Sequence, residues 1–323
     1  MTMYGFNAFL RIAPETGTYA DSGSLGTPID TRLNSSSLIM DQEKNRKTNL
    51  SVPASGMLAS MYDGFLTGGG SIDIPLQYDN SGVLIYMALG KVTTTAVGSD
   101  YRHDYVPDFD LQSCNIKFQR GSNLANSMEE FKGSMVASMS MSCEAGGEMS
   151  ASFEIISQNA SARGGNITSS FPADGDSILH FECGDLIMGG TLAAPDLKIR
   201  SFDLTLDNKL ERKNVLGSKT TAQPVISDVR EVTMSITADL DDNTVYSDML
   251  LDKSGTVSLK FTRTAMTDHY FQITLDNAII EGYSDAVSSF GRVERTFTVR
   301  GLAGTSDDGL KISIRNDNSS GYA

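Results

Sequence analysis

The sequence predicts a mainly β protein built from two similar halves, each with one short helix. Most segments alternate apolar and polar residues with period two, which is typical of strands with one buried face. Only two short segments have a helical pattern, and the order of elements in the first half recurs in the second. With 323 residues, 40% of them hydrophobic, the chain is long enough for about two domains and apolar enough to fill their cores.

The clearest strands flank the turn Ala145–Gly147. Apolar and polar residues alternate from Ser134 to Glu144, and the alternation resumes from Glu148 to Ile155. Glycine supplies the positive φ that such a turn needs, so the pattern predicts a β-hairpin with one buried and one polar face. We expect the polar face to consist of Ser134, Ser138, Ser140, Ser142, Glu144, Glu148, Ser150, Ser152 and Glu154.

Other segments extend this pattern on both sides of the hairpin. Alternation predicts strands at residues 71–78, 200–206, 232–238, 257–261, 271–275 and 293–300. The two helical segments are Gly82–Gly90, which ends in a glycine suited to a helix C-terminus, and Asn243–Leu251.

An internal repeat relates the two halves. In each half a strand runs through an acidic turn into the short helix, and a later hairpin strand follows. Gly147–Ile155 aligns with Gly291–Val299 at an offset of 144, which leaves 16 extra residues in the loop-like stretch Lys91–Phe109. The strands before the helices align at an offset of 160: Ile72, Ile74 and Leu76 with Val232, Met234 and Ile236. Chance similarity between alternating strands is the alternative, but the shared element order favours duplication.

Composition places the boundary between the halves. Residues 158–176 are rich in Gly, Ser, Asn and Pro without periodicity, which is typical of a linker. We therefore expect a first domain at 1–160, a linker at 161–176, a second domain at 177–305 and a C-terminal tail at 306–323. Residues 13–49 and 207–231 are polar and turn-rich, and loops of that length are usually functional.

The charge balance excludes several classes of protein. The 26 basic against 40 acidic residues give a net charge of −14, which argues against a protein that grips phosphates. No segment is apolar enough to cross a membrane, and the first residues do not have the pattern of a secretory signal. The three cysteines, Cys114, Cys143 and Cys183, match no metal spacing, and we expect reduced thiols.

No catalytic motif emerges, so we expect neither an enzyme nor a bound cofactor or metal. His103, His180 and His269 have no nucleophile motif beside them. The acidic turn at 239–243 begins like a calcium loop but has Thr244 and Leu250 where that loop needs glycine and glutamate, so helix capping explains it better.

Two other classes stay open from the residues alone. A β-scaffold glycosidase would use paired carboxylates, which have no fixed spacing. A β-sandwich adhesin or carbohydrate-binding module would share the Ser-, Thr- and Gly-rich strands, although the absence of tryptophan weakens a site for stacking sugars.

Several weak motifs together resemble a known family. Ala8–Glu15 forms a characteristic opening string, and a basic–polar stretch at Asn45–Lys47 leads to the step Pro53–Gly56. A Gly-rich strand at Gly68–Ile72 and a short helix ending at Leu89-Gly90 follow. Over residues 5–303 this order resembles the major tail tube proteins of long-tailed bacteriophages, in particular the larger, two-domain family.

The resemblance implies two tandem antiparallel β-sandwich or barrel domains with long loops. It also implies a structural virion protein of the tail, made in the host cytoplasm, that forms rings stacked into a hollow tube. Its partners would be other copies of itself, the tape measure protein and the tail terminator and initiator proteins. DNA would pass through the lumen without specific binding, and no membrane would be involved.

The repeat and the resemblance together predict three chains per ring in pseudo-sixfold symmetry. The polar face of the hairpin Ser134–Ile155 has no basic residue, which favours a lumen surface, with a plain solvated face as the alternative. Residues 207–231 would reach the next ring, as the corresponding loop does in that family. The residues expected to make that contact are Glu211, Arg212, Lys213, Asn214 and Lys219.

Overall fold

The computed structural model confirms a mainly β protein with antiparallel pairing. It describes residues 8–46, 61–121, 126–161, 163–169, 178–190, 192, 198–239, 244–262, 268–284, 294–304 and 309–320. The first half contains β1 (Phe9–Pro14), β2 (Ile29–Thr31), β3 (Ser35–Ser36), β4 (Ile39–Arg46), β5 (Met61–Pro75), α1 (Gly82–Leu89), β6 (Gly90–Val97), β7 (Asp100–Pro107), β8 (Cys114–Gln119), β9 (Met128–Glu144), β10 (Ser150–Ser157) and β11 (Asn159–Ala160). The second half contains the 3-10 turn η2 (Phe181–Cys183), β12 (Gly184–Gly190), β13 (Ile199–Asp207), β14 (Leu210–Lys213), β15 (Ala222–Ile226), β16 (Glu231–Asp239), α2 (Thr244–Leu250), β17 (Ser254–Thr262), β18 (Tyr270–Ser284), β19 (Glu294–Gly301) and β20 (Lys311–Asn316).

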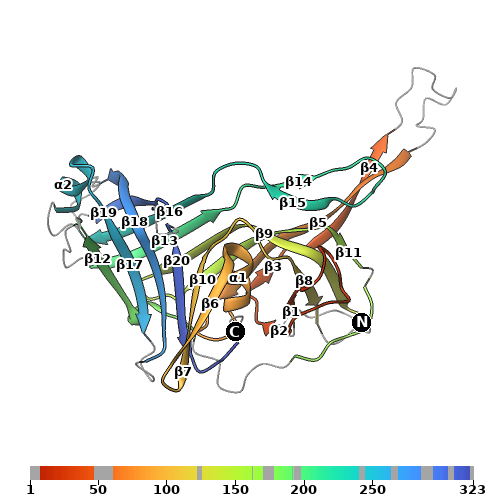
Figure 1. Ribbon diagram of the computed structural model, residues 1–323, viewed down its shortest axis with the longest axis horizontal. Helices are drawn as coiled ribbons and strands as arrows, with labels where there is room; N and C mark the ends of the chain where they lie inside the picture. Colours follow the sequence, from red (N-terminus) through yellow and green to blue (C-terminus); the bar gives the residue numbers. More distant parts are fainter. Residues whose placement is uncertain are drawn as a thin grey trace.

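One run of eight antiparallel strands passes through both halves. Its order is β4, β5, β10, β9, β13, β16, β19 and β18, and the β9–β13 pairing joins the halves. In Figure 1 the run crosses the molecule from β4 at the right to β18 at the left, with α1, β8, β1 and β2 below it. The described strands close no barrel within one chain, so the sandwich form of the prediction applies.

Two of the longest strands, β9 and β18, each take part in two layers. The first part of β9 pairs with β8, and its later part pairs with β10 and β13. The first part of β18 pairs with β17 and β20, and its later part with β19. The side chains enclosed between these layers form one hydrophobic cluster that extends through both halves.

Both predicted helices are present. Every residue of α1 except Tyr86 is buried, because the helix lies against β9 in the core, and Gly90 ends it with a φ of 99°. The predicted helix at 243–251 corresponds to α2, although residues 240–243 of the acidic turn lie outside the described residues. Among the helices that the structure describes, none is long and apolar enough to span a membrane.

The strand registers of the two halves coincide in detail. On the β9–β10 and β18–β19 pairs an irregularity falls at the same place, leaving one extra residue, Ala137 or Glu281, on the long strand. Two pairs in the first half have counterparts 144 positions later: Phe153–Met139 with Phe297–Tyr283, and Ile155–Val136 with Val299–Ile280.

The alignment of the preceding strands at an offset of 160 is wrong by four residues. Ile72 on β5 lies opposite Phe153, and the residue opposite Phe297 is Ile236, which lies 164 positions after Ile72. An alternating strand resembles itself after any even shift, because its side chains repeat every two residues. The partner strand fixes the register, and the sequence alone does not show the partner.

Three segments expected to be loops contain strands. The stretch 91–109 holds the β6–β7 hairpin, 207–231 holds the two-stranded ribbon β14–β15, and 13–49 holds β2, β3 and β4. Most of β6 is exposed, and a strand with both faces in water needs no apolar alternation. The run of β-branched residues Thr93–Thr95 is the feature of this segment that favours a strand.

Candidate assembly surfaces

The β9–β10 hairpin presents the predicted polar face. Its central serines on β9 are partly exposed, as are those on β10, while the three glutamates are exposed. The residues found on this face are Ser138, Ser140, Ser142, Glu144, Glu148, Ser150, Ser152 and Glu154.

Ser134 does not belong to this face. It is fully buried, and its Oγ lies 2.8 Å from Oγ of Ser157. The strict alternation fails here because the bulge at Ala137 changes which side of β9 each residue faces, so Met135 and Val136 are both buried. The glycine at position 133, whose φ is 59°, is the residue type in this segment that indicates an irregular strand.

The polar face continues well beyond the hairpin, onto strands on both sides of it that the alternation within the hairpin does not predict. On β13, Asp203 lies opposite Ser142 and Thr205 lies opposite Ser140. Directly opposite residues of paired strands share a face, so the registers extend the surface to β5, β16 and β19. The added residues are Ser71, Asp73, Ser201, Asp203, Thr205, Asp207, Thr233, Ser235, Thr237, Thr296 and Thr298.

Hydroxyl and carboxylate groups bond to one another across this face. Ser152 donates to Oδ1 of Asp73 over 2.5 Å, and the hydroxyls of Thr237 and Thr296 lie 2.9 Å apart. These bonds hold short side chains in place while leaving oxygen lone pairs for water. The surface is therefore hydrated and carries carboxylate charge.

The basic residues on this face and at its margins are paired with acids. Arg300 lies opposite Thr233 and so belongs to the face, and its Nε lies 2.6 Å from Glu281. At the margin, Arg200 contacts Asp239 at 3.0 Å and Glu294 at 2.7 Å.

Lys209 Nζ lies 2.8 Å from Asp207 at another margin. Partial burial opposes ionisation of Asp207, but the hydrogen bonds from Lys209 outweigh it and lower the pKa of this carboxyl. The carboxylate therefore stays charged at neutral pH.

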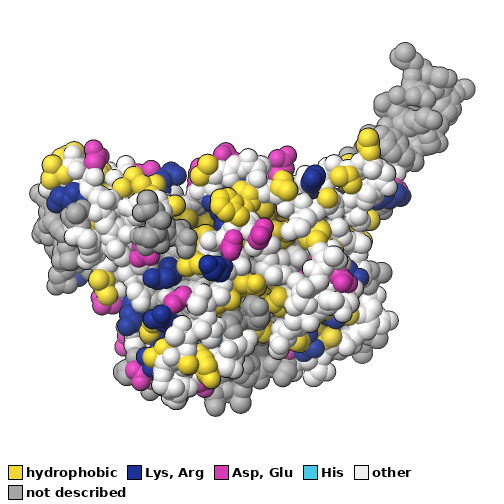
Figure 2. Space-filling model, viewed as in Figure 1, with side chains coloured by type: hydrophobic (Ala, Val, Ile, Leu, Met, Phe, Trp, Pro, Cys, Tyr) yellow, Lys and Arg dark blue, Asp and Glu magenta, His cyan; other side chains and the backbone are white. Residues whose placement is uncertain are grey.

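On the side of the molecule that Figure 2 shows, Lys and Arg side chains lie among Asp and Glu side chains. A surface that holds nucleic acid concentrates Lys and Arg, whereas the registers give the polar face mainly hydroxyl and carboxylate side chains.

The β14–β15 ribbon is the second candidate surface. Its base is fastened to its own chain by Arg212, which donates to the carbonyl oxygens of Ser157 (3.0 Å) and Gly68 (2.5 Å). Burial lowers the pKa of this guanidinium, which still remains charged. Lys219 pairs with Asp63 at 3.1 Å.

Besides that ion pair, the carbonyl oxygen of Lys219 accepts a hydrogen bond from the backbone N–H of Leu66 on β5 at 2.8 Å. The stretch 213–217, between Arg212 and these contacts, is the tip of the ribbon. Glu211, Lys213 and Asn214 are exposed, and so are the apolar side chains of Val215 and Leu216. Of the five residues expected to meet a neighbouring ring, the structure thus places Arg212 and Lys219 against their own chain and leaves three in solvent.

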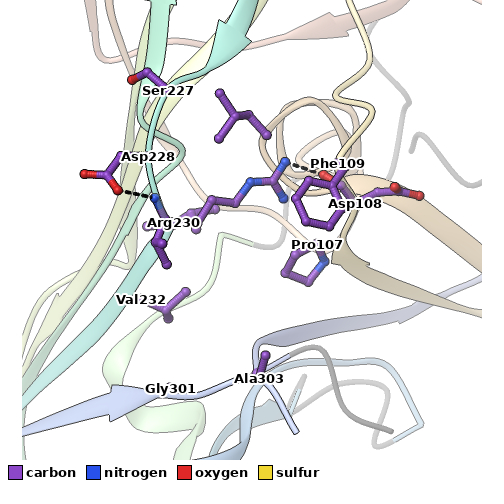
Figure 3. Close-up of a pocket in the computed structure, with 13 residues that line it drawn as sticks. Pro107, Asp108, Phe109, Ser227, Asp228, Arg230, Val232, Gly301 and Ala303 are labelled. Atoms are coloured by element: carbon purple, nitrogen blue, oxygen red, sulfur yellow. Dashed lines mark hydrogen bonds between the residues drawn. The ribbon is translucent and has the colours of Figure 1, made fainter. Parts of the chain in front are cut away.

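A cavity of about 640 Å³ lies at the base of the ribbon. Figure 3 shows the side chain of Arg230 extending across it towards Phe109, with its guanidinium 6.0 Å from the ring centre. Arg230 donates to the carbonyl oxygen of Asp108, while Phe109 and Val229 are largely exposed. The described lining includes neither histidine nor cysteine, so it offers no usual nucleophile–base pair.

The histidines have structural surroundings. His103 is buried, with Nδ1 2.9 Å from Oγ1 of Thr94 and Nε2 2.9 Å from the carbonyl oxygen of Asn318, and burial lowers its pKa. His269 lies 4.0 Å from Asp100, and His180 faces the turn η2 that it precedes. The described residues contain no group of three or more potential metal ligands.

Comparison with known proteins decides the family. A family model described as phage tail tube protein matches residues 5–301, nearly the whole chain. The chain belongs to the phage tail tube protein family. No curated protein matches it.

Membership of the tail tube family confirms the resemblance seen in the sequence. It makes the chain a structural protein of the virion tail whose copies assemble into a tube. The polar face and the ribbon are accordingly candidate surfaces of that assembly.

Proposed function

We propose that this tail tube protein forms rings that stack into a hollow conduit for DNA, with the polar face of the eight-stranded run lining the lumen. The observation that carries the proposal is the continuous surface of mainly hydroxyl and carboxylate side chains, in which Arg300 and, at the margins, Arg200 and Lys209 are each paired with acids. Duplex DNA carries about one negative charge per 1.7 Å of axis. A conduit with this lining repels DNA, keeps it hydrated and offers its phosphates no cation that lacks an acidic partner.

The same chain supplies two tandem domains in this proposal. Domain boundaries at 160 and 177, with a linker at 161–176, separate β1–β11 from β12–β19, and β20 lies in the C-terminal tail at 306–323; residues 170–177 lie outside the described part of the chain. The 144-residue spacing of matching strand pairs and the bulges at Ala137 and Glu281 support a duplication. Three chains would then supply six similar units to a ring.

Stacking and accessory partners complete the proposal. The exposed tip of the β14–β15 ribbon would contact the next ring through Glu211, Lys213 and Asn214 together with Val215 and Leu216. The tape measure protein would occupy the lumen, and the tail initiator and terminator proteins would meet the two ends. Synthesis would take place in the host cytoplasm before assembly of the tail.

Electron microscopy of the purified full-length protein tests this function. With the tail initiator present, we expect hollow rings or tubes with a central channel. A protein that stays monomeric at high concentration with the initiator supplied would overturn the proposal.

A further inference from the structure

Two strand edges of the eight-stranded run are open at opposite ends of the molecule. Within the described residues, β4 pairs only with β5, and the end of β18 beyond Ile280 pairs only with β19. Figure 1 shows β4 and β18 at opposite ends of the longest axis. Such edges carry unpaired backbone donors and acceptors that another chain can complete.

The chain itself contains one pairing of two such edges, which we call the β9–β13 joint. Where the halves meet, β9 pairs with β13, and Ser140 lies opposite Thr205 while Met139 lies opposite Leu206. The two apolar side chains are each 1% exposed. The two hydroxyl side chains lie on the polar face.

Because the strand registers of the two halves repeat, each open edge can be matched with one strand of the β9–β13 joint. β18 corresponds to β9 at the spacing of 144 residues already found for Met139 and Tyr283. β4 corresponds to β13, because the strands they pair with, β5 and β16, are related by 164 residues. The matching pairs are Ile39–Gly69 with Thr205–Thr233, and Met40–Gly68 with Leu206–Val232, so β4 lies 166 positions before β13.

We propose that the end of β18 in one copy pairs antiparallel with β4 of a second copy, in the register of the β9–β13 joint. Tyr283 then lies opposite Met40, and Ser284 lies opposite Ile39. The inference rests on the proposed ring, and it specifies which edges meet and in which register.

The apolar residues at these two edges are only partly covered, as expected of strands whose partner strand is absent. Met40 and Tyr283 pack against the core but are only partly buried, whereas their counterparts in the β9–β13 joint are almost completely covered. Beside them, the ring of Tyr246 lies 5.2 Å from that of Tyr283, centre to centre, and Tyr246 is 42% exposed. A second copy would cover this apolar surface and gain the corresponding free energy.

A joint of this kind suits a closed ring. It is heterologous, because one edge of the chain meets a different edge of the next copy, and such contacts form rings when the rotation closes. If the joint between copies repeats the joint within a copy, every step around the ring is the same. The chain's own β9–β13 geometry then sets the curvature of the whole ring.

Cysteine cross-linking of the assembled protein tests the register. Ser284→Cys with Ile39→Cys places the two cysteines directly opposite each other, where the Cα separation of about 4.5–5.5 Å suits a disulfide. We expect oxidation to link separate chains into dimers and trimers on a non-reducing gel.

Two control pairs calibrate that result. Ser140→Cys with Thr205→Cys reproduces the same geometry within one chain and closes without linking chains. Ser284→Cys with Met40→Cys shifts the pair by one residue, so the thiols point to opposite faces and do not link. The unsubstituted chain is run beside them because it has three cysteines of its own.

The outcomes separate this inference from the proposed function. Tubes that link through the Ser284–Ile39 pair and not through the shifted pair support the register. Tubes that form but link through the shifted pair, or through neither, overturn the register while the proposed function stands. A chain that forms no tubes with the initiator present overturns both.

Discussion

Ser140 lies at the centre of the polar face, directly opposite Ser152 on one side and Thr205 on the other. Neither of these two neighbours carries a charge, so a cation introduced here has no counter-ion directly opposite it. Glu154 is exposed on the same face, opposite Ser71 and Ser138. These two positions therefore report on what passes over the face.

The double variant Ser140→Lys, Glu154→Lys is expected to form normal rings and to slow DNA ejection. The added ammonium groups hold passing phosphates, and salt weakens each such contact through screening and counterion release. Ejection rates from assembled virions, measured from low to high salt, check this, with relief of the slowing as salt rises. Ser140→Gln, Glu154→Gln is the matched neutral control. Ejection at the normal rate by the lysine variant in low salt would exclude this face from the lumen.

Single residues also mark the limit of what alternation predicts. The sequence correctly indicated eight of the nine polar-face residues of the hairpin, because they lie on the regular parts of β9 and β10. Ser134 failed because the bulge at Ala137 inverts the pattern, and a bulge depends on the partner strand as much as on the bulged one. The remaining residues of the face, such as Asp203, required the register of β13 against β9.

At the scale of elements, the β14–β15 ribbon is expected to matter little for folding of the subunit and much for its assembly. Arg212 holds the base of the ribbon against its own chain. The segment beyond it contributes the Lys219–Asp63 ion pair and two hydrogen bonds, from Leu66 N–H to the carbonyl oxygen of Lys219 and from Gln158 to that of Thr221. An exposed ion pair contributes about 0–1 kcal/mol to the free energy of unfolding. The tip therefore adds little to the stability of the subunit.

Deleting residues 213–223 is expected to leave a folded subunit that no longer builds tubes. The deletion spares the hydrophobic core, so the melting temperature falls by only a few degrees, whereas contacts to the next ring are lost. Circular dichroism melting and electron microscopy check the two halves of this statement. Val215→Asp, Leu216→Asp keeps the ribbon at full length and serves as a milder test of the apolar tip. Normal tubes from the deletion variant would show that the ribbon is not the joint between rings.

The ribbon and the β6–β7 hairpin show why polar segments were mistaken for loops. β6 and β14 are largely exposed, so no apolar face marks them in the sequence. Backbone pairing defines these two strands, and backbone pairing has no direct signature in side-chain polarity. Helix α1 was predictable for the opposite reason, since its apolar run ends at a glycine with positive φ.

At the scale of the whole molecule, the β9–β13 pairing is the decisive contact. It makes one continuous sheet out of two repeated units, and its residues, such as Ser140 and Thr205, are 65 positions apart in the sequence. Sequence reasoning could identify the repeat from the order of its elements. It could not show that the two units join edge to edge, because periodicity says nothing about which edges meet.

That contact leads to the prediction of three chains and six lobes per ring. Three β9–β13 joints within chains would alternate with three β18–β4 joints between chains, so top views would show approximate sixfold symmetry while native mass spectrometry gives three copies. The two kinds of joint also differ in strength, because the first is held within one covalent chain and the second loses translational entropy when it forms. Mild denaturant is therefore expected to release folded monomers before any β9–β13 joint opens, which a Ser140→Cys, Thr205→Cys disulfide formed in released monomers would report. Rings of six chains would contradict the prediction, because only one unit of each chain could then reach the channel.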